Sequence, residues 1–314
     1  MYEKTVERFG FYDKYTFFDR DWGQSMSIVP ACGGCLVELI LKGQSILDAY
    51  TSPEEMDTHK KSKSEWLVPF PNRLMQGQYT FEGVSYQFPK IKRHMGHAIH
   101  GFVIGEPMVL HSVQVEPNQV RAICRYDYDG LRPYYPFPFR LDICYQLHSQ
   151  EGLTIELSLT NRGTSSLPIG LGWHPYFTLG PLADEWTLQL PDCRKVLVNE
   201  LMIPSGETQA YDHFRTASQI GARSLDNCFV LTNQQEGEAE IHLSDGRRNL
   251  QYWQETGPGK FNYFQLFVPP TRHSIAIEPM SCNVDAFNNR QGLVVLSPDE
   301  QMAGKFGLRM TQVR

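Results

Sequence analysis

The segment LDICYQLHSQEGLTIELSLT, residues 141–160, alternates apolar and polar side chains on both sides of a short turn. A repeat of two residues is typical of a β-strand with one buried and one exposed face. The turn residues HSQEG at 148–152 include a glycine, which favours a reversal of the chain. Residues 141–147 and 153–160 are therefore predicted to form an antiparallel hairpin.

The same pattern of short strands recurs through the rest of the chain. A second hairpin is predicted where Glu82-Gly83 separates residues 79–81 from residues 84–86. Further strands are predicted over residues 120–128, 186–190, 195–198, 238–243, 261–268, 274–278 and 293–296. The 25 glycines and 20 prolines interrupt long helices, and residues 53–66 are predicted to be a loop or one short helix. The sequence therefore predicts an all-β protein, a large antiparallel β-sandwich.

Length and composition predict one folded domain. A β-sandwich can take up all 314 residues as one unit, and a hydrophobic content of 41% is sufficient for a packed core. We expect a single domain over residues 1–314, with residues 1–22 as an N-terminal arm or an extra strand.

Charge and hydropathy exclude several classes of function. With 29 Lys and Arg against 35 Asp and Glu, the net charge is −6, and the chain lacks the cationic surface that binds nucleic acid. It has no apolar stretch long enough to cross a membrane and no recognisable secretion signal. The seven cysteines, including Cys32 and Cys35 beside a glycine turn, are expected to be reduced. These features predict a cytoplasmic protein.

A carboxylate at the end of an apolar strand is the first candidate for chemistry. Glu278 follows Ile275-Ala276-Ile277, and Pro279 is expected to end the hydrogen bonding of the strand. Burial beside isoleucines would raise the pKa of Glu278 toward the range of a general base. The alternative is an outward-pointing carboxylate paired with a Lys or Arg.

Histidines occur in two unusual segments. His174 lies within Trp173-His174-Pro175-Tyr176-Phe177, and aromatic faces suit the apolar faces of sugar rings. A buried structural histidine is the alternative. His97 and His100 could share a metal, but on a strand they would face opposite sides, and no third ligand is near in sequence. We expect no metal.

Two further polar residues follow turn signals. Arg73, after Pro71-Asn72, offers five donors for ligand hydroxyls or a carboxylate, although it could simply cap a turn. Asp226 could accept a hydrogen bond from a sugar hydroxyl or form a turn with its own backbone.

Five short segments occur in a specific order: Asn72-Arg73, His100-Gly101, His174-Pro175-Tyr176-Phe177, Leu225-Asp226 and Glu278-Pro279. In this order they resemble the aldose 1-epimerase family, which is galactose mutarotase-like. The resemblance extends over residues 23–308, and the ordered set is specific where one motif alone would not be. It implies a mutarotase-type β-sandwich with a sugar cleft, a small-molecule sugar as partner, and no cofactor.

The resemblance also implies roles for these residues. Glu278 would be the general base and His174 the general acid, which open the ring of an aldose and reclose it to the other anomer. The remaining candidates are expected to contact the sugar: Arg73, His100 and Asp226 through its hydroxyl groups, and Asn72, His97 and Trp173 beside them.

The identity of the sugar stays open. Trp173 stands where many family members have Asn, and Phe102 where a second Gly is common. A branch of the family acts on hexose 6-phosphates, and the basic cluster from Lys90 to His94 could bind a phosphate or form a solvated strand face.

Two other functions are compatible with the same residues. One is a carbohydrate-binding protein without catalysis on the same scaffold. The other is a glycoside hydrolase that uses Asp226 and Glu278 as a carboxylate pair. The protein could act as a monomer or a homodimer.

Overall fold

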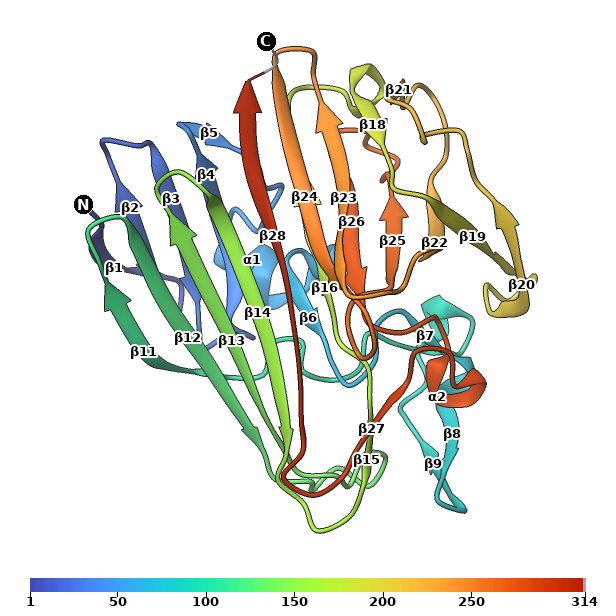
Figure 1. The fold of residues 1–314 in the computed structure, drawn as a ribbon. Coiled ribbons are helices and arrows are strands. Elements are labelled where there is room, and N and C mark those ends of the chain that lie inside the picture. Colours follow the sequence, from blue (N-terminus) through green and yellow to red (C-terminus); the bar gives the residue numbers. More distant parts are fainter. Residues whose placement is uncertain (313–314) are drawn as a thin grey trace.

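Antiparallel strands dominate the computed structural model, which describes residues 1–312 (Figure 1). The largest sheet has nine strands. Their order is β11 (Val109–Val115), β12 (Gln119–Tyr128), β13 (Phe139–His148), β14 (Gly152–Asn161), β28 (Gln301–Gln312), β24 (Arg248–Thr256), β23 (Gly237–Ser244), β18 (Thr187–Gln189) and β21 (Ser218–Gln219).

Two further large sheets complete the main architecture. The eight-stranded sheet has the order β20 (Pro204–Ala210), β19 (Cys193–Val198), β22 (Asp226–Leu231), β25 (Tyr263–Phe267), β26 (Ile275–Met280), β16 (Gly172–His174) and β6 (Glu65–Leu67), with β17 (Tyr176–Phe177) paired to β26. The five-stranded sheet has the order β1 (Glu3–Phe9), β2 (Tyr12–Asp19), β3 (Gln24–Val29), β4 (Cys35–Leu41) and β5 (Gln44–Ser45).

The remaining elements are short. Three two-stranded sheets pair β7 (Arg73–Leu74) with β10 (Ala98–Ile99), β8 (Gln78–Phe81) with β9 (Val84–Gln87), and β15 (Leu167–Ile169) with β27 (Val294–Leu296). The helices are α1 (Pro53–Asp57) and α2 (Ala286–Asn289), with single 3₁₀ turns η1 (Lys60–Ser62), η2 (Met75–Gly77), η3 (Lys92–His94) and η4 (Ala183–Glu185). Within residues 1–312, none of the helices has the length and apolar character needed to span a bilayer.

The predicted β-sandwich is confirmed. Figure 1 shows the nine-stranded sheet as one layer, with the five-stranded and eight-stranded sheets behind it. The hairpin predicted over residues 141–160 is β13 and β14, in which Ile143 pairs with Leu157. Alternate residues of β13, including Ile143 and Tyr145, are fully buried in the core between the layers. Burial of each such side chain stabilises the fold by about 1.5–3 kcal/mol.

Aromatic side chains connect the eight-stranded sheet to the nine-stranded sheet. Trp66 on β6 packs edge-on against Tyr145 on β13, with ring centroids 6.0 Å apart. Trp66 also stacks on Trp173 of β16 at 5.6 Å. The eight-stranded sheet is therefore anchored to the core from one side, which leaves its other side free to build a pocket.

The structure corrects one local prediction and specifies two others. Strand β26 does not end at Glu278 but continues to Met280, with Pro279 paired to Phe264. Residues 53–66 contain the short helix α1, where the Ser52 hydroxyl accepts a hydrogen bond from the Glu55 N–H. Residues 3–19 form β1 and β2, a hairpin that extends the five-stranded sheet.

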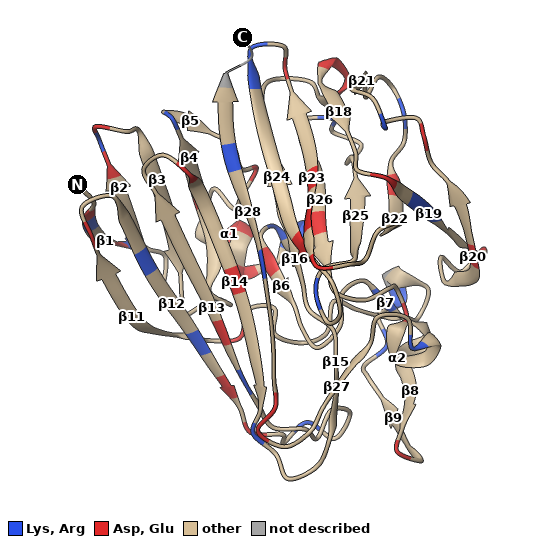
Figure 2. Cartoon of the chain, in the orientation of Figure 1, with Lys and Arg blue, Asp and Glu red and all other residues tan. Residues whose placement is uncertain are grey.

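Acidic and basic residues are interspersed along the strands and loops (Figure 2). Many of them form ion pairs across neighbouring strands, as Arg125 of β12 does with Asp142 of β13 at 2.6 Å. Such pairs on partly exposed strand faces contribute little to stability, about 0–1 kcal/mol each.

Candidate active site

A pocket of about 570 Å³ lies on the side of the eight-stranded sheet that faces away from the core. Strand alternation explains its position. On β26, Ile275 and Ile277 point into the core, so Glu278 between Ile277 and Pro279 points to the opposite side. The neighbouring strands β22, β25 and β16 each contribute a polar side chain to the same side.

Six of the eight site residues predicted from sequence line this pocket. They are Asn72, Arg73, His100, His174, Asp226 and Glu278. They come from segments more than 200 residues apart along the chain, and the sheet brings them together. The two others, His97 and Trp173, lie elsewhere.

Glu278 and His174 are in direct contact on adjacent strands. Oε1 of Glu278 lies 3.4 Å from Nε2 of His174, and both side chains are buried. Oε2 of Glu278, Nδ1 of His174 and Nε of Arg73 are buried without a hydrogen-bond partner among the described residues. Unpaired buried polar atoms are uncommon in folded proteins, and their concentration at one pocket indicates a site built for a polar ligand.

Burial shifts the pKa values of the two groups in opposite directions. It raises the pKa of Glu278 well above that of a free carboxyl; the charge of Asp226 raises it further, and Arg73 opposes the shift. Burial lowers the pKa of His174 to about 4. Both shifts favour the uncharged form of each side chain, because a low dielectric disfavours charge. The pair therefore holds one proton over a wide range of pH.

His100 presents a hydrogen-bond donor to the pocket. Its Nδ1 accepts a hydrogen bond from the Asn72 N–H at 3.2 Å, so the proton of the neutral ring is on Nε2. Burial, followed by nearby basic groups, lowers the pKa of His100 well below that of a free histidine and keeps the ring neutral. The ring lies edge-on to that of His174 at 5.3 Å.

A chain of hydrogen bonds connects the remaining polar residues. Nη1 of Arg73 donates to Oδ1 of Asn72 at 3.1 Å, and Nδ2 of Asn72 donates to Oε1 of Gln265 at 3.3 Å. Nε2 of Gln265 then donates to Oδ1 of Asp226 at 2.7 Å. Gln265 on β25 pairs directly with Glu278 on β26. The sequence analysis missed Gln265; its position between Phe264 and Leu266, which point into the core, was the available signal.

The aromatic wall of the pocket differs from the one predicted. Tyr176 and Phe267 line it, and the Tyr176 ring stacks on His174 at 5.0 Å. Trp173 does not: it is fully buried in the core, stacked on Trp66 and Phe306. Because neighbouring residues on a strand face opposite sides, Trp173 and His174 could not both reach the pocket.

His97 also lies outside the pocket. Its Nδ1 accepts a hydrogen bond from the Gln76 N–H at 3.0 Å, and its Nε2 is 3.0 Å from the Leu201 carbonyl oxygen. Both ring nitrogens are thus used to hold loops together. Within the basic cluster from Lys90 to His94, His94 lines the pocket, whereas Lys90 and Lys92 do not.

The loop of residues 59–64 forms a wall that the sequence analysis did not assign to the site. His59, Lys61 and Ser62 line the pocket there. The backbone has positive φ at His59 (48°), Lys61 (62°), Ser62 (51°) and Ser64 (56°). Such values are uncommon outside glycine and concentrate at functional sites.

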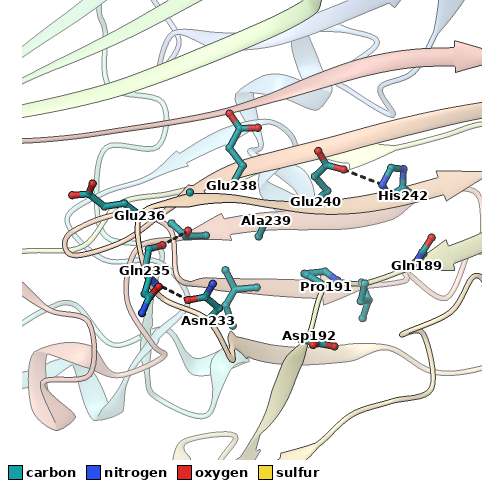
Figure 3. A pocket seen from close by; sticks show the side chains of 14 residues that line it. Gln189, Pro191, Asp192, Asn233, Gln235, Glu236, Glu238, Ala239, Glu240 and His242 are labelled. Atoms are coloured by element: carbon teal, nitrogen blue, oxygen red, sulfur yellow. Dashed lines mark hydrogen bonds and ion pairs between the residues drawn. The ribbon is translucent and has the colours of Figure 1, made fainter.

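A second hollow, of about 320 Å³, lies beside β18 and β23 (Figure 3). Its lining includes the acidic residues Asp192, Glu236, Glu238 and Glu240, and Glu240 pairs with His242 at 3.3 Å. Its described lining residues include no Lys, Arg, Phe, Tyr or Trp. It therefore lacks both the buried acid–base pair and the aromatic surface of the larger pocket.

Known proteins share sequence and fold with this chain. The family model for aldose 1-epimerase matches residues 20–309. The uncharacterized protein YihR of Escherichia coli is 28% identical over 284 residues, which cover 87% of this chain and 86% of YihR.

Solved structures share the fold at low sequence identity. A galactose mutarotase-like protein from Clostridium acetobutylicum superposes with a TM-score of 0.87 and 18% identity, covering 100% of this chain and 99% of that one. Galactose 1-epimerase from Lactobacillus acidophilus superposes with a TM-score of 0.83 and 15% identity, with coverage of 100% and 99%. Because the family model matches nearly the whole length of this chain, the chain belongs to the aldose 1-epimerase family.

Proposed function

We propose that this protein is an aldose 1-epimerase, which interconverts the α and β anomers of a hexose. The contact of 3.4 Å between Glu278 and His174 inside a polar and aromatic pocket carries the proposal. The reaction moves protons at two sugar oxygens, the C1 hydroxyl and the ring oxygen O5. Both are bonded to C1, so an adjacent base and acid suit them.

The proposed reaction starts with ionised Glu278 and protonated His174. Glu278 removes the proton of the C1 hydroxyl, and the electron pair of the O–H bond forms the carbonyl at C1. The C1–O5 bond breaks, and O5 takes the proton of His174. Rotation about the C1–C2 bond then presents the other face of the aldehyde, and the reverse proton transfers close the ring to the other anomer.

The pair carries one proton at every stage of this cycle. Before ring opening the proton is on His174, and afterwards it is on Glu278. The second arrangement, with both side chains neutral, is the one that burial favours in the free site. Each positioned acid or base typically contributes about 10²- to 10⁴-fold to the rate.

The rest of the pocket would hold the sugar while C1 turns. His100 Nε2–H and the Arg73 guanidinium are donors, and Asp226 is an acceptor held in place by Gln265. Tyr176 and Phe267 offer ring faces for the apolar side of a pyranose.

Anomer-exchange NMR of common aldoses tests the proposal. The protein is expected to accelerate exchange, and Glu278→Gln is expected to lower the rate by about 10²-fold or more while calorimetry still detects sugar binding. Glu151→Gln, on the exposed turn between β13 and β14, is the matched control and is expected to keep full activity.

Other outcomes would identify a different function. Sugar binding without exchange would indicate a carbohydrate-binding protein. Release of reducing sugar from a disaccharide would indicate a glycoside hydrolase that uses Asp226 and Glu278. Failure to accelerate exchange of any common aldose or its 6-phosphate would refute the proposal.

A further inference from the structure

The wall of the pocket beyond His174 carries a positive charge that the reaction proposed above does not use. In the eight-stranded sheet, β16 lies between β26 and β6, so His174 separates Glu278 from the loop that precedes β6. Lys61 and Ser62 of that loop line the pocket. Asp226 and Gln265 lie on the other side of Glu278, on β22 and β25.

The loop of residues 59–64 is fixed at both ends. Nδ1 of His59 lies 2.7 Å from Oε1 of Glu65, and the Ser64 N–H donates to the His174 carbonyl oxygen at 2.8 Å. The buried Lys63 points inward, where its Nζ contacts Asp48 at 2.8 Å and Glu55 at 3.0 Å. These contacts hold the backbone of Lys61 over the pocket, directly beside the strand that carries His174.

Lys61 differs from the basic residues on either side of it. The charges of His59 and Lys63 are matched by carboxylates. Lys60 and Lys61 are both exposed, and of these two only Lys61 lines the pocket. Lys61 forms no ion pair among the described side chains, and its charge helps to lower the pKa of the nearby Asp48. An ammonium group in this position is available to an anion that enters the pocket.

The connectivity of a pyranose indicates which part of the sugar meets Lys61. The ring oxygen O5, which His174 would protonate, is bonded to C1 and to C5. C5 carries the exocyclic carbon C6, so a C6 substituent extends from the His174 side of the ring, away from the C1 hydroxyl at Glu278. Neighbouring strands are about 4.8 Å apart. One strand beyond His174 is β6, with the loop of Lys61 before it.

We propose that Lys61 binds a negatively charged group on the exocyclic carbon of the sugar, so that the preferred substrate is an anionic aldose. The proposal rests on the epimerase function and specifies its substrate class. A phosphate ester and a carboxylate share the required chemistry, and Ser62 beside Lys61 provides a hydroxyl for either. Among basic residues it assigns the anion to Lys61, rather than to Lys90 or Lys92, which are exposed and do not line the pocket.

Anomer-exchange kinetics with matched neutral and anionic sugars test this assignment. The substrates are glucose and galactose, their 6-phosphates and the corresponding uronic acids, which distinguish the two anions. We expect the wild-type protein to favour at least one anionic sugar over its neutral parent tenfold or more in kcat/KM. Lys61→Ala should lower this ratio about tenfold or more, as expected for loss of a charged hydrogen bond, and Lys61→Glu should lower it further. Lys60→Ala is the matched control and should leave the ratio unchanged.

Each alternative result has a separate meaning. Exchange of neutral sugars with no preference for anionic ones, or an equal effect of Lys61→Ala and Lys60→Ala, would overturn the role of Lys61 and leave the epimerase function intact. If no sugar exchanged, the epimerase function would fail. Calorimetric titration would still decide the anion site. The Glu278→Gln variant, with and without Lys61→Ala, would be titrated with the two 6-phosphates, the two uronic acids and their neutral parents. Tighter binding of an anionic sugar than of its neutral parent, lost in Lys61→Ala, supports the site, and equal binding refutes it.

Discussion

A side chain on Gly101 would collide with the main-chain carbonyl group of Val68. The two residues form a parallel bridge, and the Val68 oxygen accepts a hydrogen bond from the Phe102 N–H at 2.9 Å. Gly101 has a φ of 68°, and His100 before it has a φ of 62°. The close approach of these two backbones fixes the direction of the His100 ring in the pocket.

Replacement of this glycine should damage both stability and function. Gly101→Ala adds a methyl group where there is no space and requires positive φ from alanine, so we expect a loss of more than about 1 kcal/mol in the free energy of unfolding. The displacement of His100 should also raise KM. Gly83→Ala is the control, because Gly83 has a φ of 80° but no atom near its missing Cβ. Equal losses in the two variants, by chemical denaturation, would show that the contact with Val68 is unimportant.

The pH dependence of exchange should be bell-shaped. As pH falls toward the pKa of His174, about 4, the pair gains a second proton and the base is lost. As pH rises through the raised pKa of Glu278, the pair loses its last proton and the acid is lost. The measurement is kcat/KM by NMR between pH 3 and 10, after subtraction of the spontaneous rate. A flat profile would contradict a proton-sharing pair.

Gln265 should act by holding Asp226 and Asn72. Gln265→Leu removes both hydrogen bonds and leaves the Asp226 carboxylate without its donor. Hydrogen bonds to charged groups contribute about 1.5–3 kcal/mol, so kcat/KM should fall about 10-fold or more, chiefly through KM. Gln189→Leu on the exposed face of β18 serves as control. An unchanged KM in Gln265→Leu would refute this positioning role.

His97 and His100 should respond differently to the same substitution. His97→Ala removes two hydrogen bonds between loops and should lower the free energy of unfolding by about 2 kcal/mol, with kcat/KM of the folded protein retained. His100→Ala removes a donor from the pocket and should raise KM about tenfold. Thermal unfolding and exchange kinetics on both variants make the comparison. A loss of kcat/KM in folded His97→Ala equal to that of His100→Ala would contradict the structure.

The strands with strict alternation were predictable because period and turn chemistry agree, as in residues 141–160. The twelve-residue strand β28 was missed because it contains two glycines, which weaken a strand pattern. Packing explains both: a Cβ on Gly304 would lie 2.8 Å from the Phe261 ring, and one on Gly307 would lie 2.6 Å from Nε1 of Trp253. These glycines leave space for large aromatic rings from neighbouring elements. The sequence around each glycine does not indicate which ring will pack against it.

The site was predictable where a motif names the residue and strand alternation gives its direction. Glu278 and His174 meet both conditions, whereas Trp173 shares the motif but has the wrong direction. Lys61 meets neither condition. Its loop is held by Lys63 through carboxylates from Asp48 and Glu55, and local periodicity cannot reveal such contacts.

The central position of β26 has a consequence for biosynthesis. It inserts between β25 and β16, and both of these strands precede it in the chain. A nascent polypeptide that ends before residue 275 already contains His174 and Asp226 but has an open slot in the sheet. The proposed turnover therefore requires this late strand to dock, and recovery of activity during refolding cannot precede that step.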